Sequence, residues 1–483
     1  MQFNSITFLV FLPIVFAVYH WIPSSKIRSQ NILLLIASYM FYGWWDWHFL
    51  GLIFISSITD YLVGLEMGKA IQIHKRKFLL LVSIVTNLGI LGFFKYFNFF
   101  IDSFVDLLSL FHMNTNYSTL QIILPVGISF YTFQTLSYTI DIYKNKIKPT
   151  KDIIAFFAFV AFFPQLVAGP IERAASLLPQ FLNSRKFQYG QVVDGLRLMM
   201  WGFFKKMVIA DRLAAYVDLI YSNPDQYKGI GIVIGTVFFA FQIYCDFSGY
   251  SDIAIGTAKL FGFNLMTNFQ TPYFSASFRE FWRRWHISLS TWFRDYLYIP
   301  LGGNRVSQNR WFFNIIFTFT ISGLWHGANL TFIFWGLIHG FLLGLEIILG
   351  KYSSYYSNMF RPVKVIFVFA LVCLTWIFFR AESIEKAFNM INYSFEFPNQ
   401  VLHLDSLASV FTDIFINKVD SIAILISGMV FFIVEWRLGK SSFEKVIVKV
   451  PGYLRWPAYY LLIGWILIFG IYKVAPSFIY FQF

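Results

Sequence analysis

Two histidines in the second half of the chain each follow a tryptophan directly, in apolar surroundings. His286 lies in SFREFWRRWHISLSTWFRDYLYIPLGGNR (277–305), and His326 lies in ISGLWHGANLTFIFWGLIHG (321–340). An ionisable side chain at membrane depth is costly, so it indicates a functional site by default. A neutral imidazole can take a proton from a hydroxyl group as that hydroxyl attacks an acyl carbon. The two histidines are therefore the first candidates for a reaction centre inside the bilayer.

Small residues surround His326, with Gly323 before it and Gly327 after it. Small residues let a backbone or a substrate approach closely, and burial without a counter-charge favours the neutral form of a histidine. From the residues alone, a structural histidine bonded to a neighbouring helix is an equal alternative. His339 follows 13 residues later, about 220° around a helix, so the two histidines do not form a metal pair on one helix. The other histidines lack the spacing of metal ligands, and we expect no metal site.

The segment that carries His286 has a helical pattern. Ser277 followed by Glu280 is a capping-box pattern that predicts a helix start, and Pro300 ends the pattern. One continuous helix would carry a cationic stripe and a separate aromatic stripe. The cationic stripe would contain Arg279, Arg283, His286, Ser290 and Arg294, and the aromatic stripe Trp282, Trp285, Leu289, Trp292 and Tyr296.

Two interpretations of this helix remain open from the spacing. It is either an interfacial helix whose arginines contact lipid phosphates, or those arginines also hold an anionic cofactor such as coenzyme A. We interpret Asp295 as a salt-bridge partner of one of the arginines.

The composition is that of a protein that crosses a membrane many times. Of 483 residues, 57% are hydrophobic and 13% are charged, against about 25% charged residues in soluble proteins. No stretch is polar enough for a soluble domain of roughly 100 residues. The net charge of +13 fits basic cytoplasmic loops, and no basic, aromatic module supports binding to nucleic acid.

Thirteen apolar segments approach the length of about 20 residues that a membrane span needs, which predicts roughly 11 to 13 membrane helices. Some are short or interrupted by glycine and proline, so we expect re-entrant segments covered by protein or water. The segments are 6–22, 31–46, 48–65, 78–101, 120–142, 152–168, 192–210, 229–247, 311–327, 330–349, 363–380, 419–436 and 456–475.

The charges of the loops predict the orientation of the spans. The first connection carries Lys26 and Arg28, the next one around Asp46 has no basic residue, and basic and non-basic loops alternate up to Lys151. Basic loops face the cytoplasm, so the N-terminus is predicted to lie outside. No basic residue precedes segment 6–22 and no cleavage site follows it, so we interpret it as a retained first span.

At this point the residues resemble a known family, the membrane-bound O-acyltransferases (MBOAT), and especially the bacterial branch typified by the membrane subunit of alginate O-acetylation. The similarity runs over nearly the whole chain, with long motifs in the family's order. These are FNSITFLVFLPIVF with SYMFYGWWD, LPVGISFYTFQTLSY (124–138), FFPQLVAGPI (162–171), QIYCDFSGYSDIAIGTAKLFGF (242–263), residues 268–305 and GLWHGANLTFIFWGLIHG (323–340).

The resemblance implies an all-α, polytopic MBOAT fold with a central tunnel through a thinned centre. Residues 1–483 would form a single transmembrane domain. Within it, 6–151 would be the N-terminal helices, 152–349 the core with the catalytic motifs, and 350–483 the C-terminal helices.

The resemblance also implies roles for single residues. His326 matches the near-invariant catalytic histidine of the family and would be the general base. His286 matches the second polar position and would orient or polarise the substrate. The acyl-CoA-binding residues would be Arg283, Arg284, Arg294 and Arg305, and the tunnel-lining residues would be Trp285, Trp325, Asn329 and Asp295. The GAN sequence that ends at Asn329 is a variant of the more usual GAxW.

The implied activity is that of a membrane O-acyltransferase. It would move an acyl group, expected to be acetyl, from cytoplasmic acetyl-CoA or another acyl-CoA through the membrane. The expected result is O-acetylation of an extracytoplasmic polysaccharide, either an alginate-like exopolysaccharide or peptidoglycan. A thioester is already activated, so no metal, ATP or permanently bound cofactor is expected.

The expected location is the bacterial inner membrane, with membrane lipid around a multi-pass protein. Because the chain lacks a soluble extracytoplasmic domain, the resemblance implies a partner, an SGNH-type acetyltransferase that completes the transfer to the polysaccharide. Two alternatives remain. The first is D-alanyl transfer to teichoic acid, which shares the histidines but takes its acyl group from a carrier protein. The second is a transporter of glycan or lipid, whose charges should line a path between both faces.

Overall fold

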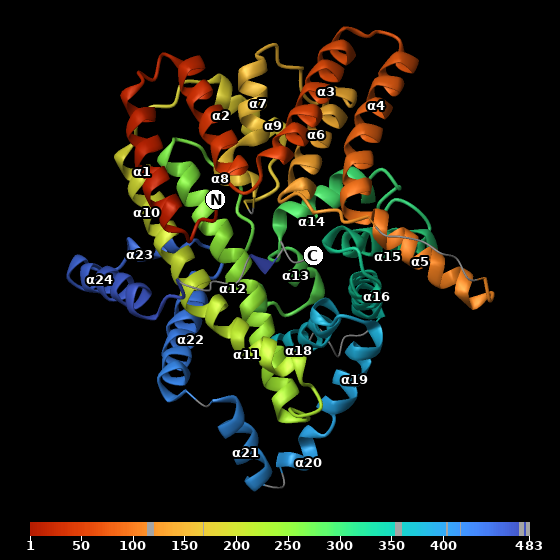
Figure 1. Ribbon diagram of the computed structural model, residues 1–483, viewed down its shortest axis with the longest axis vertical. Coiled ribbons are helices and arrows are strands. Elements are labelled where there is room, and N and C mark those ends of the chain that lie inside the picture. Colours follow the sequence, from red (N-terminus) through yellow and green to blue (C-terminus); the bar gives the residue numbers. More distant parts are fainter. Residues whose placement is uncertain are drawn as a thin grey trace. The chain divides into compact units, whose positions relative to one another are not determined.

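The computed structural model describes residues 1–113, 120–167, 169–352, 360–401, 404–415, 417–472 and 478–479 (Figure 1). These parts contain helices and no strands, so the all-α prediction is confirmed. The chain forms two compact units, Met1–Leu196 with Ala254–Met266, and Arg197–Ile253 with Thr267–Phe483.

The first unit is a set of packed helices in which α3 contacts both α4 and α6 (Figure 1). A buried polar seam joins these three helices, because Asn87 donates a hydrogen bond to Asp60 at 2.8 Å and accepts one from Thr135 at 3.2 Å. The helices are α1 (Ile6–Trp21), α2 (Ile27–Gly43), η1 (Trp47–Phe49), α3 (Leu50–Lys69), α4 (Ile73–Leu91), η2 (Gly92–Tyr96), α5 (Phe97–Leu110), α6 (Ile128–Tyr143), α7 (Ile153–Ala161), α8 (Phe163–Leu166), α9 (Ala174–Leu182) and the start of α10 (Tyr189–Phe203).

The second unit contains both candidate histidines. In its described part, α15 and α16 pack along each other extensively, and α16 also packs on α18. Its α12 runs on into the first unit after Ile253. The elements after α10 are η3 (Phe204–Ala210), α11 (Asp211–Ser222), α12 (Ile230–Leu260), η4 (Pro272–Phe274), α13 (Phe278–Trp282), α14 (Ile287–Phe293), η5 (Arg294–Tyr298), α15 (Gln308–His326), α16 (Leu330–Tyr352), α18 (Arg361–Arg380), α19 (Ile384–Ser394), α20 (Phe397–Val401), α21 (Leu404–Ile414), α22 (Lys418–Leu438), α23 (Phe443–Ile447) and α24 (Gly452–Phe469).

Within the described residues, six helices are long and apolar enough to cross a membrane, and two shorter apolar helices accompany them. The six are Trp47–Lys69, Ile73–Leu110, Ile230–Leu260, Leu330–Gly350, Arg361–Arg380 and Lys418–Leu438. Within the described residues, each of the thirteen predicted apolar segments overlaps at least one helix, although the segment 120–142 becomes helical only at Ile128. Residue 168 of the segment 152–168 and residues 473–475 of the segment 456–475 lie outside the described residues. The protein is therefore a multi-pass membrane protein.

The single amphipathic helix predicted around His286 is wrong. Ser277 does cap a helix, since its hydroxyl accepts a hydrogen bond from the Glu280 amide at 3.0 Å, but α13 ends at Trp282. His286 itself has a left-handed backbone with φ of 41°, and α14 begins only after it. The predicted cationic stripe is therefore broken, with Arg283 exposed and His286 buried.

Candidate active site

The two predicted histidines lie side by side in the second unit, although 40 residues separate them in the chain. The centres of the His286 and His326 rings are 6.4 Å apart. The His286 residue is 0% exposed and His326 is 2% exposed. The structure thus brings the two candidates together in one buried position.

A polar cradle holds His286. Its Nδ1 lies 3.1 Å from Oδ1 of Asn268, and that same oxygen accepts a hydrogen bond from the Ser288 hydroxyl at 2.8 Å. The amide nitrogen of Asn268 donates to the hydroxyl of Ser251 on α12 at 3.1 Å. An oxygen that only accepts requires a donor opposite it, so Nδ1 carries the proton and Nε2 keeps its lone pair.

The backbone explains why this histidine turns inward. The Ile287 amide donates to the Asn268 carbonyl at 2.9 Å, which ties the start of α14 to the segment before α13. A positive φ is uncommon for a residue with a side chain and persists only where the surroundings enforce it. His286 also lies outside the candidate membrane spans, and burial lowers its pKa to about 3. It is therefore neutral at physiological pH.

Aromatic rings surround His326. The helix α15 ends at this residue, because Gly327 is extended with φ of −161°. The ring of His326 lies 5.0 Å from Trp325, 5.1 Å from Trp335 and 5.3 Å from Phe379, measured between ring centres. This surrounding of rings lowers the local polarity around the imidazole.

Glycine allows the helix end that carries His326 to approach α16 closely. A Cβ on Gly323 would lie 2.2 Å from the carbonyl oxygen of Phe332, and one on Gly336 would lie 2.3 Å from that of Phe319. Real side chains cannot occupy such positions, so these two glycines fix the distance between α15 and α16.

Buried His339 is a third histidine near the pair, which the sequence pattern did not place in the site. It lies on α16, and its Nε2 is 2.9 Å from the hydroxyl of Thr375. The Trp335 ring lies 4.8 Å from His339 and 5.1 Å from His326, so one indole contacts both rings. The helix break at Gly327 allows this arrangement, which a single continuous helix would not.

The four predicted acyl-CoA arginines differ in their surroundings. Arg283, Arg294 and Arg305 are exposed. The side chain of Arg284 is 12% exposed and pairs with Glu280 at 2.6 Å, so it already stabilises the fold. Arg294 pairs with Asp295 at 2.8 Å, which confirms the predicted salt bridge of that aspartate. The binding of acyl-CoA by these residues stays a prediction.

The residues predicted to line a tunnel have different neighbours. Trp325 lies 6.0 Å from the His286 ring, so it contacts both histidines. Trp285 is 1% exposed and lies 5.0 Å from Trp376. Asn329 caps α16, because it accepts from the Thr331 amide at 2.9 Å and donates to the Glu382 carbonyl at 3.1 Å.

A buried charge network close to His286 was missed by the sequence analysis. Lys205 contacts Asp252 at 2.7 Å, and Lys206 contacts both Asp211 and Asp246 at 2.7 Å. Both lysines lie in η3, a π-helical segment of a kind that is frequent at functional sites. Two adjacent lysines inside the predicted apolar segment 192–210 were the available signal.

The network and the histidine share helix α12. Asp246 binds Lys206, while the next residue, Phe247, packs edge-on against the His286 ring at 4.6 Å. Burial raises the pKa of Asp211, which lies outside the candidate spans, to about 7, while Lys206 lowers this pKa and the carboxylate of Asp246 raises it. The ion pairs therefore anchor the part of α12 on which His286 rests.

An apolar hollow of about 210 Å³ lies near Trp285. Its lining includes Tyr244 and Tyr273, and both rings lie 6.0 Å from Trp285, the residue before His286. The other lining residues are Phe241, Phe274, Val365, Ile366, Phe369, Phe431, Phe432 and Glu435.

Comparison with known proteins places the histidines in a family context. The profile of MBOAT, the membrane-bound O-acyltransferase family, matches residues 145–383, which include both histidines. The chain is 44% identical over 399 residues to the probable alginate O-acetylase AlgI of Pseudomonas aeruginosa, covering 82% of this chain and 75% of that protein. It is 34% identical to the peptidoglycan O-acetyltransferase of Helicobacter pylori, over 80% of this chain and 79% of that protein. It is 25% identical to the teichoic acid D-alanyltransferase of Bacillus subtilis, covering 53% and 69%.

Proposed function

The chain belongs to the membrane-bound O-acyltransferase family, and on this premise we propose that it moves an acetyl group through the membrane for the O-acetylation of an extracytoplasmic polysaccharide. It is a membrane acyltransferase, and the proposed donor is acetyl-CoA on the cytoplasmic side of the bacterial inner membrane. The relatives at 34% to 44% identity carry the names alginate O-acetylase and peptidoglycan O-acetyltransferase, which supports a polysaccharide acceptor.

The observation that carries the proposal is the buried pair of histidines. His326 removes the proton from the acceptor hydroxyl as its oxygen attacks the thioester carbonyl. The bond from carbon to sulfur breaks, and the coenzyme A thiolate takes the proton from His326 to leave as a thiol. His286 offers Nε2 as a hydrogen-bond acceptor to a further donor group of the acceptor molecule and so orients it, because its Nδ1–H points to Asn268 and the attacking hydroxyl gives its single proton to His326.

The remaining site residues have supporting parts in the proposal. Exposed Arg283, Arg294 and Arg305 bind the phosphates of coenzyme A. Arg284, which forms an ion pair with Glu280, belongs to the same proposed phosphate-binding group. Trp285, Trp325, Asn329 and Asp295 line the path of the acyl group. A separate extracytoplasmic acetyltransferase of the SGNH type then completes transfer to the polysaccharide.

The rival activity is D-alanyl transfer to teichoic acid. Two relatives with that name are 25% and 30% identical over 53% and 46% of this chain, against 44% over 82% for the alginate O-acetylase. We therefore place acetyl transfer first.

A complementation experiment tests the proposal. The gene is deleted and restored as wild type, His326→Ala or His339→Gln, with each protein matched for its amount in the membrane. Ester-linked acetate and D-alanine are then released by mild base from the envelope and secreted glycans and measured. We expect wild type and His339→Gln to restore acetate and His326→Ala not to.

The matched variant separates chemistry from folding, since His339 is as buried as His326 and lies one indole away. Full restoration of acetate by His326→Ala would show that His326 is structural. A change in D-alanine instead of acetate would favour the rival activity.

A further inference from the structure

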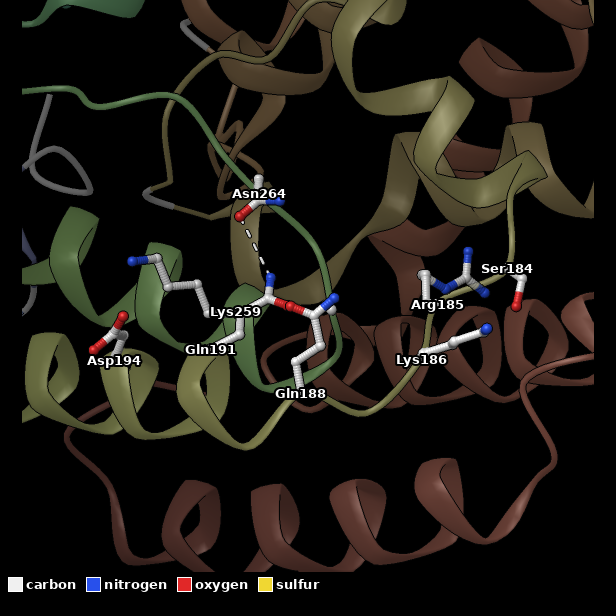
Figure 2. Close-up of a pocket in the computed structure, with 9 residues that line it drawn as sticks. Ser184, Arg185, Lys186, Gln188, Gln191, Asp194, Lys259 and Asn264 are labelled. Atoms are coloured by element: carbon white, nitrogen blue, oxygen red, sulfur yellow. Dashed lines mark hydrogen bonds between the residues drawn. The ribbon is translucent and has the colours of Figure 1, made fainter.

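A polar hollow of about 420 Å³ lies in the first unit, and its lining includes none of the predicted site residues (Figure 2). Three cationic side chains and one carboxylate face it, together with amide and hydroxyl groups. The lining residues are Ser184, Arg185, Lys186, Gln188, Gln191, Asp194, Lys259, Gly262 and Asn264.

The guanidinium of Arg185 is a buried positive charge with neutral neighbours. The residue is 6% exposed, and its N–H groups donate at 2.7 Å to the Tyr19 hydroxyl, the Gln180 carbonyl and Oδ1 of Asn31. A fourth, longer bond at 3.4 Å goes to Gln30, and within the described chain no carboxylate is among the partners of Arg185. A buried charge normally has a counter-charge, so this surplus of positive charge favours an anion nearby.

Further donors surround the same hollow. Exposed Lys186 follows Arg185, and Lys259 reaches the hollow from the end of α12, as Figure 2 shows. The amide of Gln191 lies 3.4 Å from Asn264, which holds two hydrogen-bonding side chains together at the rim. Helix α10 begins at Tyr189 between the lining residues, and the first amides of a helix favour an anion.

The hollow lies at the end of a membrane span, beside a loop that carries basic residues. The hydroxyl of Ser184 donates to the carbonyl of Ser24 at 3.0 Å, in the connection that contains Lys26. The charges of that connection predict the cytoplasmic side. The span Ile230–Leu260 ends next to the hollow, at Lys259 and Leu260.

We propose that this hollow binds a phosphate ester at the cytoplasmic face of the membrane. The charge surplus selects a dianion or monoanion, the amide groups offer hydrogen bonds to its substituent, and the volume admits a group larger than a bare ion. The headgroup of an anionic phospholipid and a water-soluble phosphate compound share this chemistry. The site is separate from the histidine pair, and its existence does not depend on the proposed activity.

Calorimetry on the purified full chain in detergent tests the site. The probes are dihexanoyl phosphatidylglycerol, dihexanoyl glycerol without a phosphate, and inorganic pyrophosphate. We expect the phosphate-free probe not to bind saturably, and the double variant Lys186→Gln/Lys259→Gln to weaken the binding of the phosphate probes by about tenfold or more. The matched variant Lys440→Gln/Lys449→Gln, which changes two exposed lysines elsewhere, should bind like wild type.

The two sources of phosphate give different results. Saturable binding of the phospholipid without competition from pyrophosphate supports a lipid headgroup, and competition by pyrophosphate supports a soluble ligand. The exposed charge reversal Lys186→Glu should weaken binding even if the double variant is unstable. Failure of both phosphate probes to bind saturably, or equal binding by wild type, Lys186→Glu and the double variant, would overturn the proposal.

Discussion

His286 and His326 lie in opposite surroundings although their rings are neighbours. The side chain of Asn268 holds His286 and is itself held by hydrogen bonds with Ser288 and Ser251, and the backbone of His286 has an unusual left-handed conformation. Indole and phenyl rings contact His326 at the ordinary end of a helix.

This difference fits the different roles that we propose for the two residues. A polar cradle fixes the tautomer and direction of a ring, which suits a residue that orients a substrate. An aromatic surrounding excludes water and strengthens nearby electrostatic interactions, which suits a residue that moves a proton. Experiments that treat the two histidines differently can therefore separate orientation from proton transfer.

The largest expected difference comes from removing each imidazole in turn. His326→Gln should lower kcat by about 10³- to 10⁴-fold, because it removes the proposed general base, while His286→Gln should lower it by about 10²-fold. The measurement is the rate of coenzyme A release by purified protein supplied with acetyl-CoA, the proposed partner acetyltransferase and a polysaccharide acceptor. A larger loss in His286→Gln would reverse the roles that we assign.

The next effect concerns the cradle. Asn268→Ala should lower kcat by about 10- to 100-fold with little change in the KM for acetyl-CoA, because His286 keeps its place in the core but loses its orientation. Equal changes in kcat and KM would indicate a general structural defect instead.

The pH dependence sharpens the same comparison. With a pKa of about 3, His286 in the wild type stays neutral from pH 8 down to pH 5 and contributes no step to the profile. Asn268→Asp places a carboxylate against Nδ1, which raises the pKa of His286 and favours the imidazolium as the pH falls. Protonated Nε2 cannot accept a hydrogen bond, so the variant should lose activity between pH 7 and pH 5 relative to wild type. Superimposable profiles of kcat against pH for the wild type and Asn268→Asp would contradict the contact between residue 268 and Nδ1 of His286.

The motif around the histidines could be found from sequence, but the shape of the His286 segment could not. A helical wheel assumes one regular helix, whereas a hydrogen bond from Ile287 to Asn268, 19 residues earlier, forces His286 into a positive φ. Tertiary contacts of this kind leave no periodic pattern. The apolar segments were predictable because burial in lipid requires continuous hydrophobic length.

The polar parts of the interior were harder to predict. Lys205 and Lys206 stand inside an apolar segment, and their partners Asp252 and Asp246 lie 47 and 40 residues later in the chain. Only the fold brings such residues together, so the sequence indicates that buried charges exist but not how they pair. The same holds for Asn268, whose role depends on the chain turning back toward His286.

A smaller effect should follow from separating α15 and α16. Gly323→Ala puts a methyl group where the Phe332 carbonyl lies at 2.2 Å, so the end of α15 must shift and carry His326 with it. We expect a loss of about tenfold in kcat and of about 1–3 kcal/mol in stability. The matched change is Gly428→Ala in α22, where open space surrounds the new methyl group. Thermal unfolding and turnover of both variants are measured in the same detergent and compared with those of the wild type. Only Gly323→Ala should differ from the wild type.

The smallest expected effect concerns the arginines outside the histidine pair. The triple variant Arg283→Gln/Arg294→Gln/Arg305→Gln removes exposed charges, so the fold should persist and the KM for acetyl-CoA should rise several-fold while kcat stays close to wild type. Added salt should raise the KM of the wild type towards that of the variant, because salt screens exposed charges. Arg284→Gln serves as the contrast, since it breaks a largely buried pair with Glu280 and should lower stability more than it raises KM. An unchanged KM in the triple variant would show that the phosphates of coenzyme A bind elsewhere. It would favour the alternative that these arginines contact lipid phosphates at the membrane surface.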